Sequence, residues 1–144
     1  LDDMDNFEVF FPGGKRVAAK YRGFVVETDQ PEVAGGDNSA PSPFDLFLAS
    51  LATCAGYFVL SFCQQRNIST EGVRLTQRMH FDRETHLISK VEIEIQLPAD
   101  FPEQYRSAVI RAAELCTVKR HLQVPPAIEV SATTAPAPAP AGSR

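Results

Sequence analysis

The sequence lacks several features by which classes of protein are recognised. No part of the 144 residues gathers lysine and arginine, and the formal net charge is −4. Because binding to phosphates needs clustered positive charge, a nucleic-acid partner is not expected. The opening residues, LDDMDNFEVFF, are acidic and carry no signal-peptide pattern, so we expect a cytoplasmic protein.

Cysteine is scarce as well, and its spacing excludes two further classes. The chain has three cysteines, no CxxC motif and no Cys/His spacing typical of zinc sites. A disulfide framework of the kind found in small secreted domains is therefore not expected. We also expect no metal centre.

What the sequence does contain is a set of short strand patterns around one long apolar segment. Residues 1–132 are predicted to form a single domain, and the Pro/Ala-rich residues 133–144 a disordered tail. Short runs rich in β-branched and aromatic residues predict strands at 6–11, 15–21 and 23–29, with a hairpin turn at Pro12-Gly13-Gly14. Alternation of apolar and polar residues predicts strands at 71–82 and 88–98, joined as a hairpin across RETH, and a last strand is predicted at 127–134. Helices are predicted from residue 43 to about 66 and from about 101 to 116. The order βββ–α–ββ–α–β is that of an α+β protein.

The long apolar segment has a clear helix start. Ser42 fits an N-cap, Pro43 the first helical position, and Asp45 the third residue after the cap. From Leu46 to Cys63 the segment carries no formal charge, which is long enough to span a membrane. Because soluble strand patterns flank it on both sides, we interpret it as a buried core helix and expect no membrane association.

One stripe of this helix is more polar than the rest, and Cys54 lies within it. At about 100° per residue, the stripe covers roughly a third of the circumference. Its members are Ser50, Thr53, Cys54, Tyr57 and Ser61. Cys63 lies roughly on the opposite side, about 13 Å along the axis, and is interpreted as a buried apolar residue.

The third cysteine, Cys116, falls on the apolar stripe of the second predicted helix. If the two helices pack together, Cys54 and Cys116 can meet, although two unrelated buried cysteines would give the same pattern. A reactive Cys54 would need activation, because the middle of a helix gains little from the helix dipole. A cation from the second strand region, Arg16, Lys20 or Arg22, would supply it, and an arginine is preferred. Each of these side chains could equally belong to a solvated strand face.

At these residues the sequence resembles the OsmC/Ohr superfamily, the osmotically inducible and organic hydroperoxide resistance proteins. The resemblance extends from GGKRV to AIEV and is strongest in APSPFDLFLASLATCAG and AAELCTVKRHL. The GGKRV, TDQP and CTVKRHL segments are more similar to an OsmC-like branch than to the hydroperoxide resistance proteins proper.

The resemblance implies an intertwined homodimer, with antiparallel sheets wrapped around two central helices and active sites at the subunit interface. It implies that Cys54 is the peroxidatic nucleophile, that Cys116 resolves its sulfenic acid, and that Arg16 activates Cys54. The implied activity is reduction of organic hydroperoxides in an oxidative stress response. An external dithiol such as dihydrolipoamide would be the reductant, and no flavin, haem or metal would be required.

The sequence departs from the hydroperoxidases at one supporting position. Those proteins have a glutamate directly after the proline at the helix start, and it holds the arginine, whereas this chain has Phe44. An apolar substrate pocket is predicted from four aromatic residues, which could equally be dimer core: Phe44, Phe47, Tyr57 and Phe58.

Two other functions stay open. One is a non-peroxidatic protein that binds a small apolar ligand or senses thiol oxidation. The other is a hydrolase in which His80, His86 or His121 serves as base for Cys54.

Overall fold

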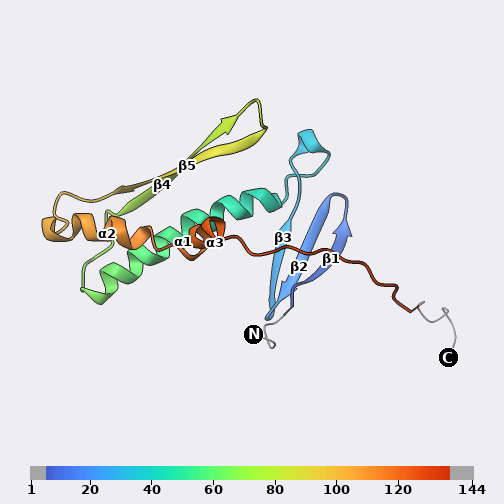
Figure 1. Cartoon of the computed structure of the whole chain (residues 1–144), viewed down its shortest axis with the longest axis horizontal. Coiled ribbons are helices and arrows are strands. Elements are labelled where there is room, and N and C mark those ends of the chain that lie inside the picture. The colour runs from blue at the N-terminus through green and yellow to red at the C-terminus, as the bar shows by residue number, and fades with distance from the viewer. Residues whose placement is uncertain (1–5, 137–144) are drawn as a thin grey trace.

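A computed structural model describes residues 6–136 and shows an α+β chain with two antiparallel sheets (Figure 1). The first sheet has the order β1-β2-β3, and the second is the hairpin β4–β5. The strands are β1 (Glu8–Gly13), β2 (Arg16–Tyr21), β3 (Phe24–Thr28), β4 (Arg74–Asp82) and β5 (Leu87–Gln96). The helices are η1 (Glu32–Ala34), α1 (Pro43–Gln65), η2 (Glu103–Tyr105), α2 (Arg106–Ala113) and α3 (Thr117–Gln123). The hairpin and the helices α2 and α3 lie along α1, whereas the β1–β3 sheet stands at one end of the molecule.

The start of α1 is the capping box that the sequence predicts. The Asp45 backbone N–H donates to Ser42 Oγ at 3.2 Å, and the Ser42 N–H donates to the Asp45 carboxylate at 3.4 Å. Two of the backbone groups that a helix end leaves unpaired are thereby satisfied. Asp45 is thus a cap, and the helix ends at Gln65, close to the predicted Arg66.

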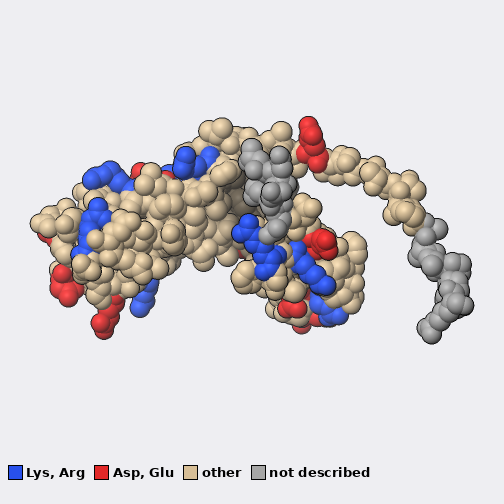
Figure 2. Space-filling model, turned by 90° about the horizontal axis from the view of Figure 1, so that it is seen from below, with Lys and Arg blue, Asp and Glu red and all other residues tan. Residues whose placement is uncertain are grey.

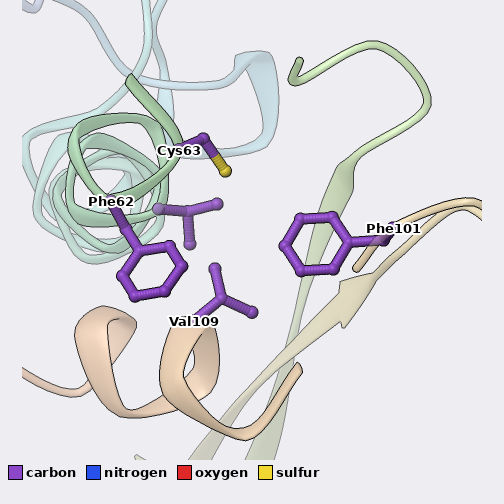
Figure 3. Packing of buried hydrophobic residues seen from close by; sticks show 5 residues of the cluster. Phe62, Cys63, Phe101 and Val109 are labelled. Carbon is purple, nitrogen blue, oxygen red and sulfur yellow. The ribbon is translucent and has the colours of Figure 1, made fainter. Parts of the chain in front are cut away.

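The packed core lies between α1, α2 and the segment before η2 (Figure 3). It consists of Val59, Phe62, Cys63, Phe101 and Val109. Cys63 is fully buried within this cluster, which confirms its prediction as a core residue. Burial in this apolar cluster raises the pKa of the Cys63 thiol, so it stays protonated and unreactive.

Within the described chain, α1 is the one helix long and apolar enough to cross a membrane by length and composition. Core helices of folded domains meet the same criterion. One seam of α1 is buried against α2, α3 and β4, as in a core helix. The seam runs through Leu51, Ala55, Val59, Phe62 and Cys63.

The two predicted hairpins are confirmed. β1 and β2 join through the Gly14–Lys15 turn, where Gly14 takes φ 58°, a conformation that costs glycine little. In the second hairpin Asp82 pairs with Leu87 across the RETH turn. The Asp82 carboxylate accepts from the N–H groups of Glu84 and Thr85, which closes this turn.

One predicted strand is wrong, and the second predicted helix is shorter than expected. Residues 127–134 form no strand in the structure, and Ile128 and Val130 are 86% and 93% exposed. A strand needs a neighbouring edge for its hydrogen bonds, and no described strand pairs with this segment. The second long helix ends at Ala113, so Cys116 lies beyond it, and TVKRHL begins α3. Most of the predicted tail, residues 137–144, lies outside the described residues.

A buried carboxylate organises the loop between β3 and α1. Asp29 is fully buried, and its oxygens accept from the N–H groups of Gln30, Asp37 and Ser39. The Ser39 hydroxyl also donates to it, at 2.6 Å. Hydrogen bonds from the Ser39 hydroxyl and these N–H groups lower the pKa of Asp29 from 3.8 to about 2.

We expect Asp29→Asn to lower the melting temperature at neutral pH, because the amide cannot accept all four hydrogen bonds. The folded-state pKa of Asp29 lies below the ordinary value, so its contribution is present above about pH 4 and is lost as the pH falls through about 2. The difference between wild type and variant should therefore shrink over that range in thermal melts. Glu32→Gln, at an exposed position, is the control. A difference that does not change with pH would show that the Asp29 charge contributes nothing.

Candidate active site

The structure brings Cys54 of α1 together with Cys116, which lies in the turn between α2 and α3. The Cys54 and Cys116 thiols lie near enough that each shifts the pKa of the other. Cys116 Sγ also lies 4.0 Å from the carbonyl oxygen of Leu51, one turn before Cys54 on α1. Both cysteines are free thiols, with Cys54 half-buried and Cys116 buried. The arrangement is therefore a reduced dithiol pair on two separate elements.

The pKa of Cys54 is affected by a feature that the sequence did not reveal, the first residues of α3. Burial acts to raise the pKa of Cys54, but hydrogen bonds from the Val118 N–H, the Cys116 thiol and the Thr117 N–H and hydroxyl outweigh it. The net effect lowers the pKa of Cys54, because each of these donors stabilises the thiolate. A mid-helix thiol on α1 thus receives its donors from another helix.

Cys116 has the opposite character. Burial, together with the nearby Cys54 sulfur, raises the pKa of the Cys116 thiol despite hydrogen bonds from the Lys119 and Val118 N–H groups. The pair therefore combines Cys54, whose thiol pKa is lowered, with Cys116, whose thiol pKa is raised. A lowered pKa favours a nucleophilic thiol, because the thiolate is the attacking form.

Arg16 is not one of the groups that act on Cys54 within the described chain. It begins β2, in the sheet at the far end of the molecule, and forms an ion pair with Asp37 at 3.5 Å. Asp37 is fixed by the Asp29 loop, because its N–H donates to that carboxylate. A carboxylate thus holds Arg16 although Phe44 occupies the position of the hydroperoxidase glutamate. Its predicted contact with Cys54 stays a prediction for the assembled dimer.

The four predicted substrate-binding aromatics lie on α1 on both sides of Cys54. Phe44 and Phe47 stack with ring centroids 5.6 Å apart, and Tyr57 and Phe58 meet edge to face at 5.5 Å. Phe44 and Tyr57 are exposed, and Phe47 and Phe58 are half-buried. They form two aromatic pairs rather than one enclosed pocket within the described residues.

A separate apolar cavity of about 350 Å³ borders Cys116. It lies between α1, β5, α2 and α3. Its walls include Leu51, Ala55, Ile93, Ala113 and Cys116, and the exposed residues Glu114 and Lys119 also border it. Neither Cys54 nor any of the four aromatics lines it.

The three histidines have other partners or positions. His80 Nε2 lies 3.2 Å from a Glu92 carboxylate oxygen, and His121 Nδ1 donates to the Thr117 carbonyl oxygen at 2.7 Å. His86 lies in the β4–β5 turn. None acts on Cys54 within residues 6–136, so the hydrolase interpretation gains no support. In the same range no group of three His, Cys, Asp or Glu residues could hold a metal ion.

Charge on the surface is mixed. In Figure 2 basic and acidic side chains are interspersed, and wide uncharged areas lie between them. This face offers no large area of one sign that would attract a polyanion.

The matches with known proteins agree with the geometry. Residues 36–131, two thirds of the chain, match the family of OsmC-like proteins, and the chain belongs to this family. Among proteins with curated descriptions, none matches it in sequence.

Solved structures show the same fold at low sequence identity. A Psychrobacter arcticus protein named for osmotic stress induction and a detoxification response has a TM-score of 0.70 and 22% identity, covering 83% of this chain and 89% of its own. An OsmC-like protein of Mycoplasma pneumoniae has a TM-score of 0.65 and 12% identity, with 85% and 89% covered. An organic hydroperoxide resistance protein OsmC of Legionella pneumophila has a TM-score of 0.55 and 17% identity, with 83% and 88% covered.

Proposed function

We propose that the protein is a thiol-dependent peroxidase that reduces organic hydroperoxides to alcohols. The observation that carries this proposal is the Cys54–Cys116 pair, in which the donors of α3 and the Cys116 thiol lower the pKa of the attacking sulfur. Membership of the OsmC-like family, and the hydroperoxide resistance protein among the structural neighbours, point in the same direction.

The proposed chemistry needs only these two thiols and an external reductant. The Cys54 thiolate attacks the distal peroxide oxygen, the O–O bond breaks, and the alkoxide takes up a proton to leave as an alcohol. Cys54 becomes a sulfenic acid, and Cys116 condenses with it, releasing water and forming a disulfide. An external dithiol such as dihydrolipoamide then reduces the disulfide by exchange.

The surroundings of Cys54 favour a substrate with an organic tail. The two aromatic pairs on α1 give this part of the surface an apolar character. Transfer of an alkyl or fatty-acyl group from water to such a surface is favourable, whereas hydrogen peroxide gains nothing there. Organic hydroperoxides should therefore react faster than hydrogen peroxide.

A count of free thiols tests the function directly. The fully reduced protein should lose two thiols for each molecule of cumene hydroperoxide consumed, and dihydrolipoamide should restore them. If the peroxide remains unconsumed over minutes with dihydrolipoamide present, the peroxidase function is wrong. The function would then be ligand binding or thiol sensing without peroxide turnover.

The site is proposed to be completed in a homodimer, because much of the apolar surface is uncovered in a single chain. Only 28% of the most apolar window of α1 is buried. One face of the β1–β3 sheet is also apolar, and Phe7 and Phe24 on it are 60% and 70% exposed. By strand register that face carries Phe7, Val9, Ala19, Tyr21, Phe24 and Val26. Apolar surface of this extent is typical of an obligate interface.

We expect sedimentation to show a dimer at micromolar concentration, with more than about 2,000 Å² buried at the interface. Phe24→Glu should weaken the dimer, because it places a charge on the apolar face of the sheet. Glu27→Gln, on the opposite face of the same strand, is the control. A wild-type protein that remains a stable monomer would contradict the assembly.

Arg16→Ala is expected to shift the alkylation of Cys54 to higher pH. In the dimer the β1–β3 sheet of one protomer would bring Arg16 near the Cys54 thiol of its partner, and loss of a nearby cation destabilises a thiolate. Iodoacetamide alkylation of Cys54 as a function of pH measures the effect. Arg83→Ala, in the exposed β4–β5 turn, is the control. An unchanged profile for Arg16→Ala would remove this residue from the site.

A further inference from the structure

The cavity beside Cys116 has no role in the chemistry proposed above. It is an apolar space of about 350 Å³ in contact with the resolving thiol and not with the nucleophile. Its volume is within the range of small-molecule binding sites, and its walls are mainly aliphatic. A peroxide must reach Cys54, so a space that borders only Cys116 is badly placed for the reacting end of the substrate.

We infer that this cavity admits the reductant, a dithiol carried on an apolar chain, and directs its attack to the Cys116 sulfur of the oxidised protein. This inference rests on the Cys54–Cys116 disulfide of the proposed function. The aliphatic walls would hold the chain of the reductant, and the exposed side of the cavity, with Glu114 and Lys119, would leave its polar end in water.

The exchange balances with these groups alone. One thiolate of the reductant attacks Cys116 Sγ, a mixed disulfide forms there, and the Cys54–Cys116 bond breaks with Cys54 leaving as a thiolate. The second thiol of the reductant, once deprotonated, attacks the reductant sulfur bound to Cys116. The reductant leaves as a cyclic disulfide, and the Cys116 thiolate takes up a proton. Two electrons have then passed to the protein, and of the two protons that the dithiol releases, one is taken up by Cys116 and the other goes to solvent.

The chemistry of the pair favours the same direction of attack. In thiol–disulfide exchange the sulfur with the lower pKa is the better leaving group. The donors that lower the pKa of Cys54, the Thr117 and Val118 N–H groups, are in place to receive the departing thiolate. Attack on Cys54 would instead expel the Cys116 sulfur, whose pKa burial raises. The cavity that borders Cys116 and the better leaving ability of the Cys54 thiolate therefore both favour attack at Cys116.

Trapping the mixed disulfide tests where attack occurs. The wild-type protein is oxidised with diamide, which forms the disulfide without any peroxide, and is then exposed briefly to 2-naphthalenethiol and quenched with iodoacetamide. Peptide mapping should find the naphthyl adduct on Cys116 and carbamidomethyl on Cys54. An adduct on Cys54 would overturn the inference, as would the absence of a Cys54–Cys116 disulfide after diamide.

A variant that fills the cavity tests its role. Ala113→Leu adds bulk to the cavity wall, whereas Ser107→Leu makes a comparable addition at an exposed position of the same helix, outside the cavity. Reduction of the diamide-oxidised protein by dihydrolipoamide should slow about tenfold in Ala113→Leu and stay unchanged in Ser107→Leu. Reduction by the smaller, more polar dithiothreitol should slow less. Equal rates for wild type and Ala113→Leu with dihydrolipoamide would overturn the inference.

The two proposals fail separately in these experiments. A protein that leaves cumene hydroperoxide unconsumed but whose diamide disulfide is attacked at Cys116 contradicts the peroxidase function alone. A protein that consumes the peroxide but is attacked at Cys54 contradicts the role of the cavity alone. If Ala113→Leu fails to fold, the adduct experiment on the wild type still decides the point.

Discussion

Cys54→Ser is expected to abolish peroxide turnover, and Cys116→Ser to leave a single turnover. A serine hydroxyl at position 54 stays protonated at neutral pH, so it cannot replace the thiolate that attacks the peroxide. In Cys116→Ser the Cys54 sulfenic acid forms but has no partner thiol. It should then accumulate and, with excess peroxide, oxidise further to sulfinic acid.

Mass spectrometry of each variant after one and after many equivalents of cumene hydroperoxide measures these states. Cys63→Ala is the matched control, because Cys63 lies in the hydrophobic core and away from the pair. This variant should turn over peroxide at the wild-type rate with a lower melting temperature, since it leaves a small core cavity. Continued turnover by Cys116→Ser under the same conditions would show that Cys116 does not resolve the intermediate.

The sequence predicted those elements whose determinants are local. The Ser42–Asp45 capping box, the turn at Gly14 and the closing of the second hairpin at Asp82 each depend on a few neighbouring residues. The apolar seam of α1 follows from periodicity, and Cys63 was correctly placed in the core for this reason. Such features need no knowledge of the rest of the chain.

What the sequence did not predict depends on contacts between distant elements. The break after Ala113 has no glycine or proline to mark it, yet it turns Cys116 to φ −45° and ψ 121° and starts a new helix. The donors to Cys54, more than fifty residues away in the sequence, exist only because of that break. Likewise residues 127–134 have a strand pattern, but pairing requires an edge that the described chain does not provide.

Thr117→Pro tests whether the start of α3 activates Cys54. Thr117 is the first residue of α3, a position where proline is common, and the extended Cys116 before it is compatible with a following proline. The substitution therefore preserves the backbone while it removes two donors to the Cys54 sulfur, the N–H and the hydroxyl of Thr117. Thr117→Ala removes the hydroxyl alone and is the matched variant.

We expect the alkylation of Cys54 in Thr117→Pro to require higher pH than in wild type, with Thr117→Ala between the two. The sign follows from the donors: each one stabilises the thiolate and lowers the pKa of Cys54, so its loss raises that pKa and leaves less thiolate at neutral pH. Loss of a hydrogen bond to a charged group should slow the reaction with cumene hydroperoxide at pH 7 by about tenfold or more. The rate should recover in part as the pH is raised, because a more basic thiol can still be deprotonated.

Melting temperatures of both variants show whether the fold is intact. A profile of Thr117→Pro that coincides with that of wild type would show that the start of α3 does not set the reactivity of Cys54.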